Sequence, residues 1–130
     1  MSGRYLLDTN VIIALFAREQ TVLDRLAAAE AVFVPAVALG ELYYGARKSG
    51  RVEQNLERID AFAAAAVLLD CSQATARRYG EIKNGLRAKG RPIPENDIWI
   101  GATAMQPDLT VATRDDDHFS QISGLRFEVW

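Results

Sequence analysis

The sequence predicts one α/β domain over residues 1–130, a doubly wound three-layer fold with a mostly parallel sheet of four to five strands flanked by helices. Short apolar runs alternate with longer segments in which apolar residues recur at helical spacing, so strands and helices alternate along the chain. Strands separated by helices pair in parallel through right-handed crossovers. A chain of 130 residues with 49% apolar content is long enough to bury a layered core.

The first strand and its helices are expected between residues 5 and 31. Residues 5–7 (Tyr-Leu-Leu) form a short apolar run that ends at an acid. Residues 11–16 and 21–31 both carry apolar side chains at helical spacing. We therefore expect a strand at 5–7 that is followed by two helical segments.

The second unit begins with the β-branched and aromatic residues 32–34, which favour a strand. Pro35 stands where a helix can begin, and Ser49 with Gly50 is a stop signal, so a helix is expected from 36 to 48. The next two expected elements are a helix at 52–64 and a strand at 66–69.

The longest helix is expected over residues 73–89, with Asp70 or Ser72 as its N-cap and Gly90 as its stop. Residues 92–94 (Pro-Ile-Pro) indicate an extended linker, after which Asn96 is expected to cap a helix. The remaining elements are that helix, which runs to Met105, then a strand at 109–112, an acidic turn at 113–117, a helical turn at 118–122 and a strand at 126–129.

The composition excludes several classes of protein. The chain has one Cys and one His, so it forms no internal disulfide and holds no Cys/His zinc centre. Its longest apolar run, residues 61–69, is far shorter than the roughly 20 residues that span a bilayer. The N-terminal apolar run meets Asp8 too early for a signal peptide, so we expect a cytoplasmic protein without membrane contact. Cys71 is expected to be a small buried residue without chemistry.

Four acids are expected to meet at one end of the sheet. Asp8 and Asp115 follow predicted strands, and Glu41 and Asp97 lie in the first turns of predicted helices. In an open parallel sheet, ligands bind beyond the carboxyl ends of the strands. The four carboxylates therefore define a candidate site.

Asp97 is the most informative of these acids, because residues 98–105 are apolar almost all round and predict a buried helix. An acid at the start of this helix either complements the helix dipole or serves a site near the core. Gly101 would allow a close approach between this helix and a neighbour, which we expect to be the strand that carries Asp8.

Carboxylates that converge in a half-buried site repel one another unless a cation compensates them. Hard oxygen ligands select Mg²⁺ or Mn²⁺, which activates water and stabilises an in-line phosphoryl displacement. The chemistry indicated is phosphodiester hydrolysis.

The same segments give the chain a family resemblance. They are Leu6-Leu7-Asp8-Thr9-Asn10, Gly40-Glu41-Leu42, Arg91 to Asp97, and Val111 to Asp115 with His118-Phe119. In this order the chain resembles a PIN-domain ribonuclease of the VapC toxin type. The resemblance implies that Asp8 and Asp97 are the principal Mg²⁺ or Mn²⁺ ligands and that Glu41 and Asp115 complete the catalytic cluster. It also implies supporting hydrogen bonds from Thr9, Asn10 and Thr113.

The resemblance further implies a homodimer, an endoribonuclease that cuts RNA, and neutralisation by a cognate VapB-like antitoxin. The alternative is a catalytically inactive PIN-fold module for RNA binding or dimerisation. The family often has Asn at the position of Asp115. Asp116 or Asp117 could share its role, although a solvated turn is the favoured interpretation for both.

Several further residues are candidates for contacts with partners. Without the four proposed ligands the chain has thirteen acids against fifteen bases, so the remainder is slightly basic. Arg87 and Arg91 are candidate RNA phosphate contacts, within a basic group that also contains Arg77, Arg78, Lys83 and Lys89. Tyr43 and Tyr44 are candidates for an antitoxin groove or the rim of the active site, with core packing of one of them favoured. His118 is the only histidine and stands beside Phe119 in a turn; it is a candidate general base, but a structural role is favoured for it.

Overall fold

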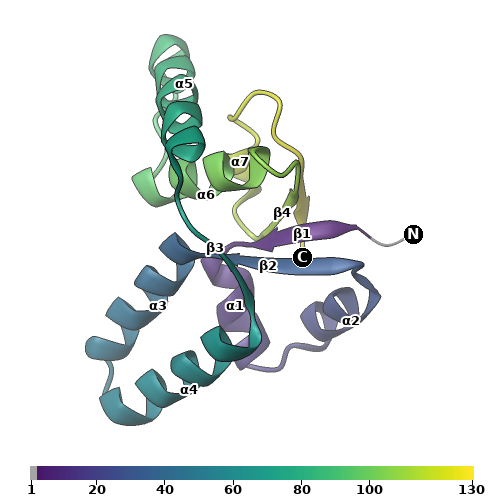
Figure 1. The fold of residues 1–130 in the computed structure, drawn as a ribbon, viewed down its shortest axis with the longest axis vertical. Coiled ribbons are helices and arrows are strands. Elements are labelled where there is room, and N and C mark those ends of the chain that lie inside the picture. The colour runs from purple at the N-terminus through teal and green to yellow at the C-terminus, as the bar shows by residue number, and fades with distance from the viewer. Residues whose placement is uncertain (1–2) are drawn as a thin grey trace.

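The computed structural model of the chain describes residues 3–130, in which helices and strands alternate (Figure 1). The first half contains β1 (Arg4–Leu7), α1 (Thr9–Phe16), α2 (Gln20–Ala28), β2 (Ala31–Pro35), α3 (Ala36–Arg47) and α4 (Val52–Ala65). The second half contains β3 (Val67–Leu69), α5 (Gln73–Lys89), α6 (Glu95–Met105), β4 (Thr110–Thr113), α7 (Asp116–Phe119) and β5 (Phe127–Val129).

The five strands form one sheet in the order β3-β2-β1-β4-β5, and every pairing is parallel. Strand β1 lies in the centre, where Leu6 is opposite Phe33 on one side and Val111 on the other. The predicted α/β fold with a parallel sheet is therefore confirmed. The carboxyl ends of β1 and β4 meet at the same edge, where their loops can share a site.

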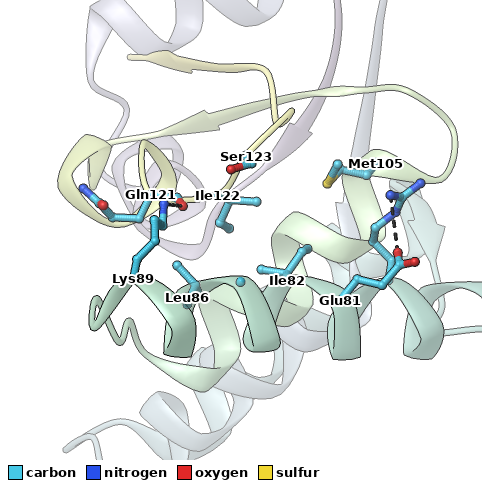
Figure 2. Close-up of a pocket in the computed structure, with 10 residues that line it drawn as sticks. Glu81, Ile82, Leu86, Lys89, Met105, Gln121, Ile122 and Ser123 are labelled. Carbon is cyan, nitrogen blue, oxygen red and sulfur yellow. Dashed lines mark hydrogen bonds and ion pairs between the residues drawn. The ribbon is translucent and has the colours of Figure 1, made fainter.

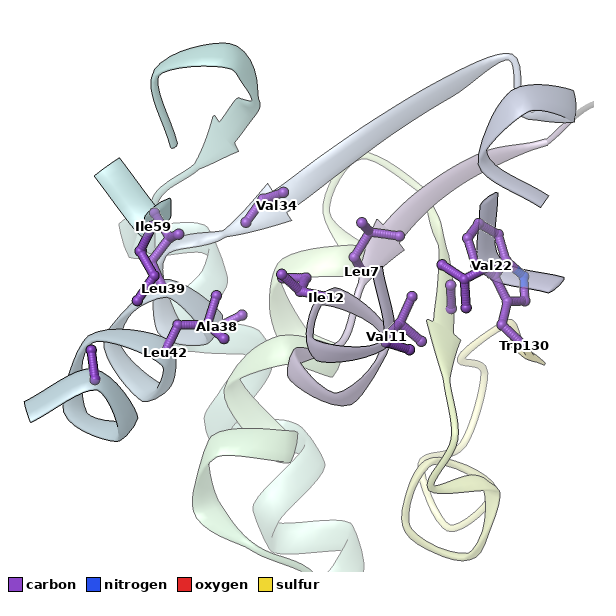
Figure 3. Close-up of a cluster of buried hydrophobic side chains, with 13 residues drawn as sticks. Leu7, Val11, Ile12, Val22, Val34, Ala38, Leu39, Leu42, Ile59 and Trp130 are labelled. Atoms are coloured by element: carbon purple, nitrogen blue, oxygen red, sulfur yellow. The ribbon is translucent and has the colours of Figure 1, made fainter. Parts of the chain in front are cut away.

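Helices cover both faces of the sheet (Figure 1). Leu6 and Leu7 are consecutive strand residues and point to opposite faces, so each belongs to a different core. The core around Leu7 is filled from α1–α4, with Val11 and Ile12 at its centre (Figure 3). The core around Leu6 is filled from α5–α7 and includes Phe119, so the two cores hold the sheet between two helical layers.

Most predicted elements are present, but several boundaries differ for local reasons. Helix α1 begins at Thr9 and not at residue 11, because Asp8 caps it directly. Helix α2 ends before residue 31, since Ala31 already pairs with Arg4 in the sheet. Strands β3, β4 and β5 each begin one residue later than predicted, and α7 covers 116–119 where 118–122 was expected.

The hydrogen bonds at the helix starts test two of the predicted N-caps. Ser72 caps α5 by accepting a hydrogen bond from the N–H of Thr75, so Asp70 does not. The prediction that Asn96 caps α6 is wrong. The carbonyl of Pro94 accepts hydrogen bonds from Asp97 and Ile98, which starts the helix at Glu95 and leaves Asn96 inside its first turn.

Two other expectations are also wrong. A Cβ at Gly101 would lie 2.8 Å from Cδ1 of Ile122, so the close approach is to the segment after α7 and not to the strand that carries Asp8. Cys71 is exposed in the loop between β3 and α5, which follows a short strand at the edge of the sheet. Among the helices of residues 3–130, none has the length and apolar character that a bilayer crossing needs.

Candidate active site

Asp8 lies at the carboxyl end of the central strand, where it is 2% exposed. Its Oδ1 accepts a hydrogen bond of 2.8 Å from the backbone N–H of Thr9, which caps α1. Its Oδ2 accepts a bond of 2.7 Å from the hydroxyl of Thr113, at the end of the adjacent strand β4. Both carboxylate oxygens are therefore held by neighbouring elements of the sheet edge.

The two residues after Asp8 hold two of the other three acids, Glu41 and Asp115. The hydroxyl of Thr9 donates to Oε1 of Glu41 at 2.7 Å, which joins α1 to α3. The amide of Asn10 donates to Oδ2 of Asp115 at 2.8 Å. The tripeptide Asp8-Thr9-Asn10 thus supplies one acid and fixes two more.

Asp97 enters the site from the first turn of α6, where it is 8% exposed. Its Oδ2 lies 2.7 Å from Nδ1 of His118. One oxygen each from Asp97 and Asp115 and one ring nitrogen of His118 all lie within 4.8 Å of one another. The four predicted acids are therefore tied into one region through the sheet edge and its loops.

His118 is the functional candidate that our interpretation of the sequence missed. We expected a structural role, but its ring contacts a predicted catalytic acid. The spacing held the signal: His118 follows Asp115 by three residues, and its backbone N–H donates to the carbonyl of Asp115 in a helical turn. A one-turn helix places these two side chains on the same side.

The electrostatics of the site indicate uncompensated negative charge. Burial raises the pKa of Asp8 from 3.8 to about 6, and the charges of Asp97 and Asp115 add to this, although the hydrogen bonds from Thr113 and Thr9 oppose it. Burial likewise raises the pKa of Asp97, with further contributions from Asp115 and Glu41 and an opposing one from His118. Glu41, Asp97 and Asp115 thus each raise the pKa of at least one neighbouring acid.

The donor set fits a hard divalent cation. Within residues 3–130, no Lys or Arg forms an ion pair with any of the four acids. Oxygen donors at a buried edge, with no Lys or Arg paired to them and with carboxyl pKa values raised mainly by burial, suit Mg²⁺ or Mn²⁺. Asp116 and Asp117 are exposed on α7 and lie outside the group formed by Asp97, Asp115 and His118, as a solvated turn would.

An apolar groove of about 510 Å³ opens between α1, α3 and α4, beside the acids. Glu41 lines it, together with Ile13, Phe16, Leu42, Ile59 and Arg58. Neither Tyr43 nor Tyr44 is among its lining residues. Tyr43 packs against the core and donates to Asp60, whereas Tyr44 is 64% exposed beneath Lys48, so one tyrosine is a packing residue as expected.

The basic residues of α5 divide into engaged and free groups. Lys83 pairs with Glu95 at 2.9 Å and Arg78 with Glu81 at 3.4 Å. Lys89 reaches across a second pocket of about 300 Å³ to the carbonyl of Gln121 (Figure 2). In the part of the chain that the structure describes, the exposed basic side chains on or just after α5 that form neither an ion pair nor a hydrogen bond are Arg77, Arg87 and Arg91.

Comparison with known proteins gives the same family at three levels. The PIN domain family model matches residues 5–125. Ribonuclease VapC2 of Haemophilus influenzae is 35% identical to this chain, with 98% of each chain covered. The tRNA(fMet)-specific endonuclease VapC of Shigella flexneri is 33% identical, also over 98% of each chain.

Several solved structures with the same fold are VapBC complexes. The DNA-bound VapBC of Salmonella typhimurium contains a chain with a TM-score of 0.90 and 30% identity, over 100% of this chain and 99% of that one. VapBC2 of Rickettsia felis, bound to a promoter DNA fragment, gives 0.89 and 30%, over 97% and 98%. With the fold, the sheet-edge acids and these matches in agreement, the chain belongs to the PIN-domain family and is a homologue of the VapC ribonucleases.

Proposed function

We propose that this protein is an endoribonuclease that depends on Mg²⁺ or Mn²⁺ and acts as the toxin of a toxin–antitoxin pair. The observation that carries the proposal is the pair of buried acids, Asp8 and Asp97, whose carboxyl pKa values are raised with no Lys or Arg paired to them in the described residues. A fold without this chemistry gains nothing from such a cluster, because mutual repulsion destabilises it. The intact set of four acids therefore disfavours the inactive RNA-binding or dimerisation module.

In this proposal Asp8 and Asp97 would hold the cation, with Glu41 and Asp115 completing the catalytic set. The bound cation would supply Lewis acidity toward water and the scissile phosphate. The protein's contribution is to fix the carboxylates before substrate binds: Thr113 and the N–H of Thr9 orient Asp8, the Thr9 hydroxyl orients Glu41, and Asn10 orients Asp115. Thr9, Asn10 and Thr113 are then positioning residues.

The proposed substrate is RNA, bound through its phosphates. Arg87 and Arg91 are exposed cations on and just after α5, in the chain segment that leads to the first turn of α6 and Asp97. Phosphate contacts of this kind set the position of a nucleic acid without reading its sequence. The relative from Shigella flexneri is named for tRNA(fMet), and we extend only the substrate class, RNA, to this chain.

The proposed protein partners are a VapB-like antitoxin and a second copy of this chain. An apolar segment of the antitoxin suits the groove between α1, α3 and α4, and a basic side chain there would meet Glu41 at its rim. The sequence indicated Tyr43 and Tyr44 of α3 as candidates for this groove. In the proposed site, Ile13 and Phe16 of α1 form the apolar lining instead. For the homodimer we point to edge strand β3, where Val67 and Leu68 are exposed.

The experiment is a cleavage assay on total bacterial RNA with the purified toxin. Cleavage is expected with Mg²⁺ or Mn²⁺, to stop in EDTA, and to stop when the protein encoded beside the toxin is added. The Asp8→Asn variant is the matched inactive control, since Asn can still cap α1. Undiminished cleavage in EDTA, or by this variant, would overturn the proposal.

A further inference from the structure

The ring of His118 contacts the carboxylate of Asp97, and the proposed function gives this contact no role. We propose that His118 is a positioning residue for Asp97, with its Nδ1–H donating to one carboxylate oxygen so that the other oxygen is presented to the cation. This inference rests on the proposed function, because it assigns a task to His118 at the same site. His118 would then be the hydrogen-bond donor for the one acid that Thr9, Asn10 and Thr113 do not contact.

The pattern of donors around the acids is the first argument. Asp8 is held by Thr113 and Thr9, Glu41 by Thr9, and Asp115 by Asn10. Within residues 3–130, the only side chain that hydrogen-bonds the Asp97 carboxylate is that of His118. Without this contact, Asp97 would be the one acid of the set whose carboxylate has no hydrogen-bond donor among the described side chains.

The way α7 holds the imidazole is the second argument. Phe119, the next residue, is completely buried in the core of α5–α7, and it anchors the turn. The backbone N–H groups of His118 and Phe119 both donate to the carbonyl of Asp115. The ring is therefore fixed relative to Asp115 and to Asp97 at the same time.

A packing role does not account for the ring. The His118 side chain is 37% exposed and belongs to neither hydrophobic core. Its contact with Oδ2 of Asp97, at 2.7 Å, is the only hydrogen bond of the ring among the described residues. The contact is short and directed at a carboxylate, as expected for a charge-assisted hydrogen bond.

Hydrogen-bond partners of metal ligands tune affinity, and their loss typically weakens metal binding roughly 10–100-fold. Two substitutions separate the donor from the ring. His118→Phe keeps a ring of similar size and removes the donor. His118→Asn removes the ring and keeps an N–H donor at the atom bonded to Cγ, where Nδ1 stands.

The test is calorimetric titration of the purified toxin with Mn²⁺ and with Mg²⁺, without RNA. We expect His118→Phe to bind both ions roughly 10-fold more weakly, and His118→Asn to bind them close to wild type. Wild-type affinity in His118→Phe would overturn the inference. So would an equal loss in both variants, or a loss for Mn²⁺ alone, which would make the imidazole itself a ligand.

Two further measurements keep the outcome decisive. Asp97→Asn is the control for the site: if the wild type binds neither ion, or if Asp97→Asn binds them as well as the wild type does, the proposed metal chemistry fails together with this inference.

Because His118 is the only histidine, nitrogen NMR of the untagged wild type reports one imidazole. At about pH 8 with Mg²⁺ we expect the proton on Nδ1, and a proton on Nε2 alone would overturn the inference even if a variant fails to fold.

Discussion

The hydroxyl of Thr113 donates to Oδ2 of Asp8 at 2.7 Å and accepts the backbone N–H of Asp115 at 2.9 Å. Thr113 is completely buried at the end of β4, so a single side chain connects the acid of the central strand to the loop that carries another acid. This hydroxyl group therefore fixes the backbone of Asp115 relative to Asp8, while Asn10 holds the Asp115 carboxylate. This relationship makes Thr113 a sensitive test of how the site is built.

We expect Thr113→Val to fold with a free energy of unfolding lowered by about 1–3 kcal/mol, because a buried donor to a carboxylate is lost without a change of shape. The pKa of Asp8 should rise further, since the Thr113 hydrogen bond lowers it. Half-maximal cleavage should then need more Mg²⁺ than in the wild type.

The matched control is Thr103→Val, another buried threonine, whose hydroxyl donates to the carbonyl of Trp99 in its own helix. Urea denaturation and Mg²⁺ titration of cleavage measure both effects. An identical Mg²⁺ requirement in the two variants would remove Thr113 from the site.

The pH dependence of stability gives a second prediction, for the metal-free protein. The folded pKa of Asp8, about 6, lies above its ordinary value of 3.8, so the folded state retains this proton better than the unfolded state. Stability from this group is fully present below about pH 4 and is lost as pH rises through 6. The rise in pKa corresponds to a penalty on the order of 3 kcal/mol for the ionised form.

Urea midpoints in EDTA should therefore fall between about pH 4 and 7 more steeply in the wild type than in Asp8→Asn, which has no proton to lose. Mg²⁺ added near neutral pH should restore stability to the wild type and not to the variant, because only the former presents the full charge. If the urea midpoints of the two proteins change in parallel with pH, burial does not raise the pKa of Asp8.

Much of the fold followed from local patterns. Strand β1 and helix α5 were predictable because an apolar run ending in Asp8, and a helix between Ser72 and Gly90, are signals contained within a few residues. The start of α6 was not predictable in this way. Asn96 is of a residue type that commonly caps helices, whereas Pro94, which does begin the helix, contributes only its backbone carbonyl.

The site shows the same division. The convergence of the acids on the sheet edge was predictable from the parallel topology, which puts the ends of β1 and β4 together. The contact between His118 and Asp97 was not, because it depends on how α7 is anchored in the core by its own Phe119. The exposure of Cys71 likewise depends on the lack of a strand outside β3.

The apolar groove between α1, α3 and α4 gives a third prediction. Ile13 is 51% exposed and lines the groove, so Ile13→Gln should weaken binding of the antitoxin and leave RNA cleavage by the free toxin unchanged. Val129→Gln is the matched control, since Val129 is 48% exposed on edge strand β5 and lies outside the groove. Binding constants from calorimetry decide it: equal affinities for the two variants would exclude this groove as the antitoxin site.

The unpaired arginines on and just after α5 give a fourth prediction. Replacing Arg87 and Arg91 together by Gln should raise KM for RNA and reduce its dependence on salt, with kcat preserved, because phosphate contacts position the substrate. Arg126→Gln is the control, since Arg126 is already paired with Asp108 at 3.2 Å. A salt dependence that stays at its wild-type slope would place the RNA elsewhere.

The last prediction separates fold from chemistry at Asp97. If this acid only complements the start of α6, Asp97→Asn should retain most of the cleavage, since the dipole contribution is about 0.3–1 kcal/mol. The substitution should leave the start of α6 unchanged, because the carbonyl of Pro94 begins this helix without a side-chain cap. The Asn side chain also keeps an oxygen that can accept the hydrogen bond from His118.

If Asp97 instead holds the cation, the substitution removes a charged ligand, and such an electrostatic contribution is worth roughly 10²–10³ in rate. Because one member of a repelling cluster is gone, the variant should unfold in EDTA at or above the wild-type temperature. We therefore expect a folded, non-toxic protein that still binds its antitoxin. Cleavage at the wild-type rate would exclude Asp97 from catalysis, whereas a lowered unfolding temperature in EDTA would assign it to the fold.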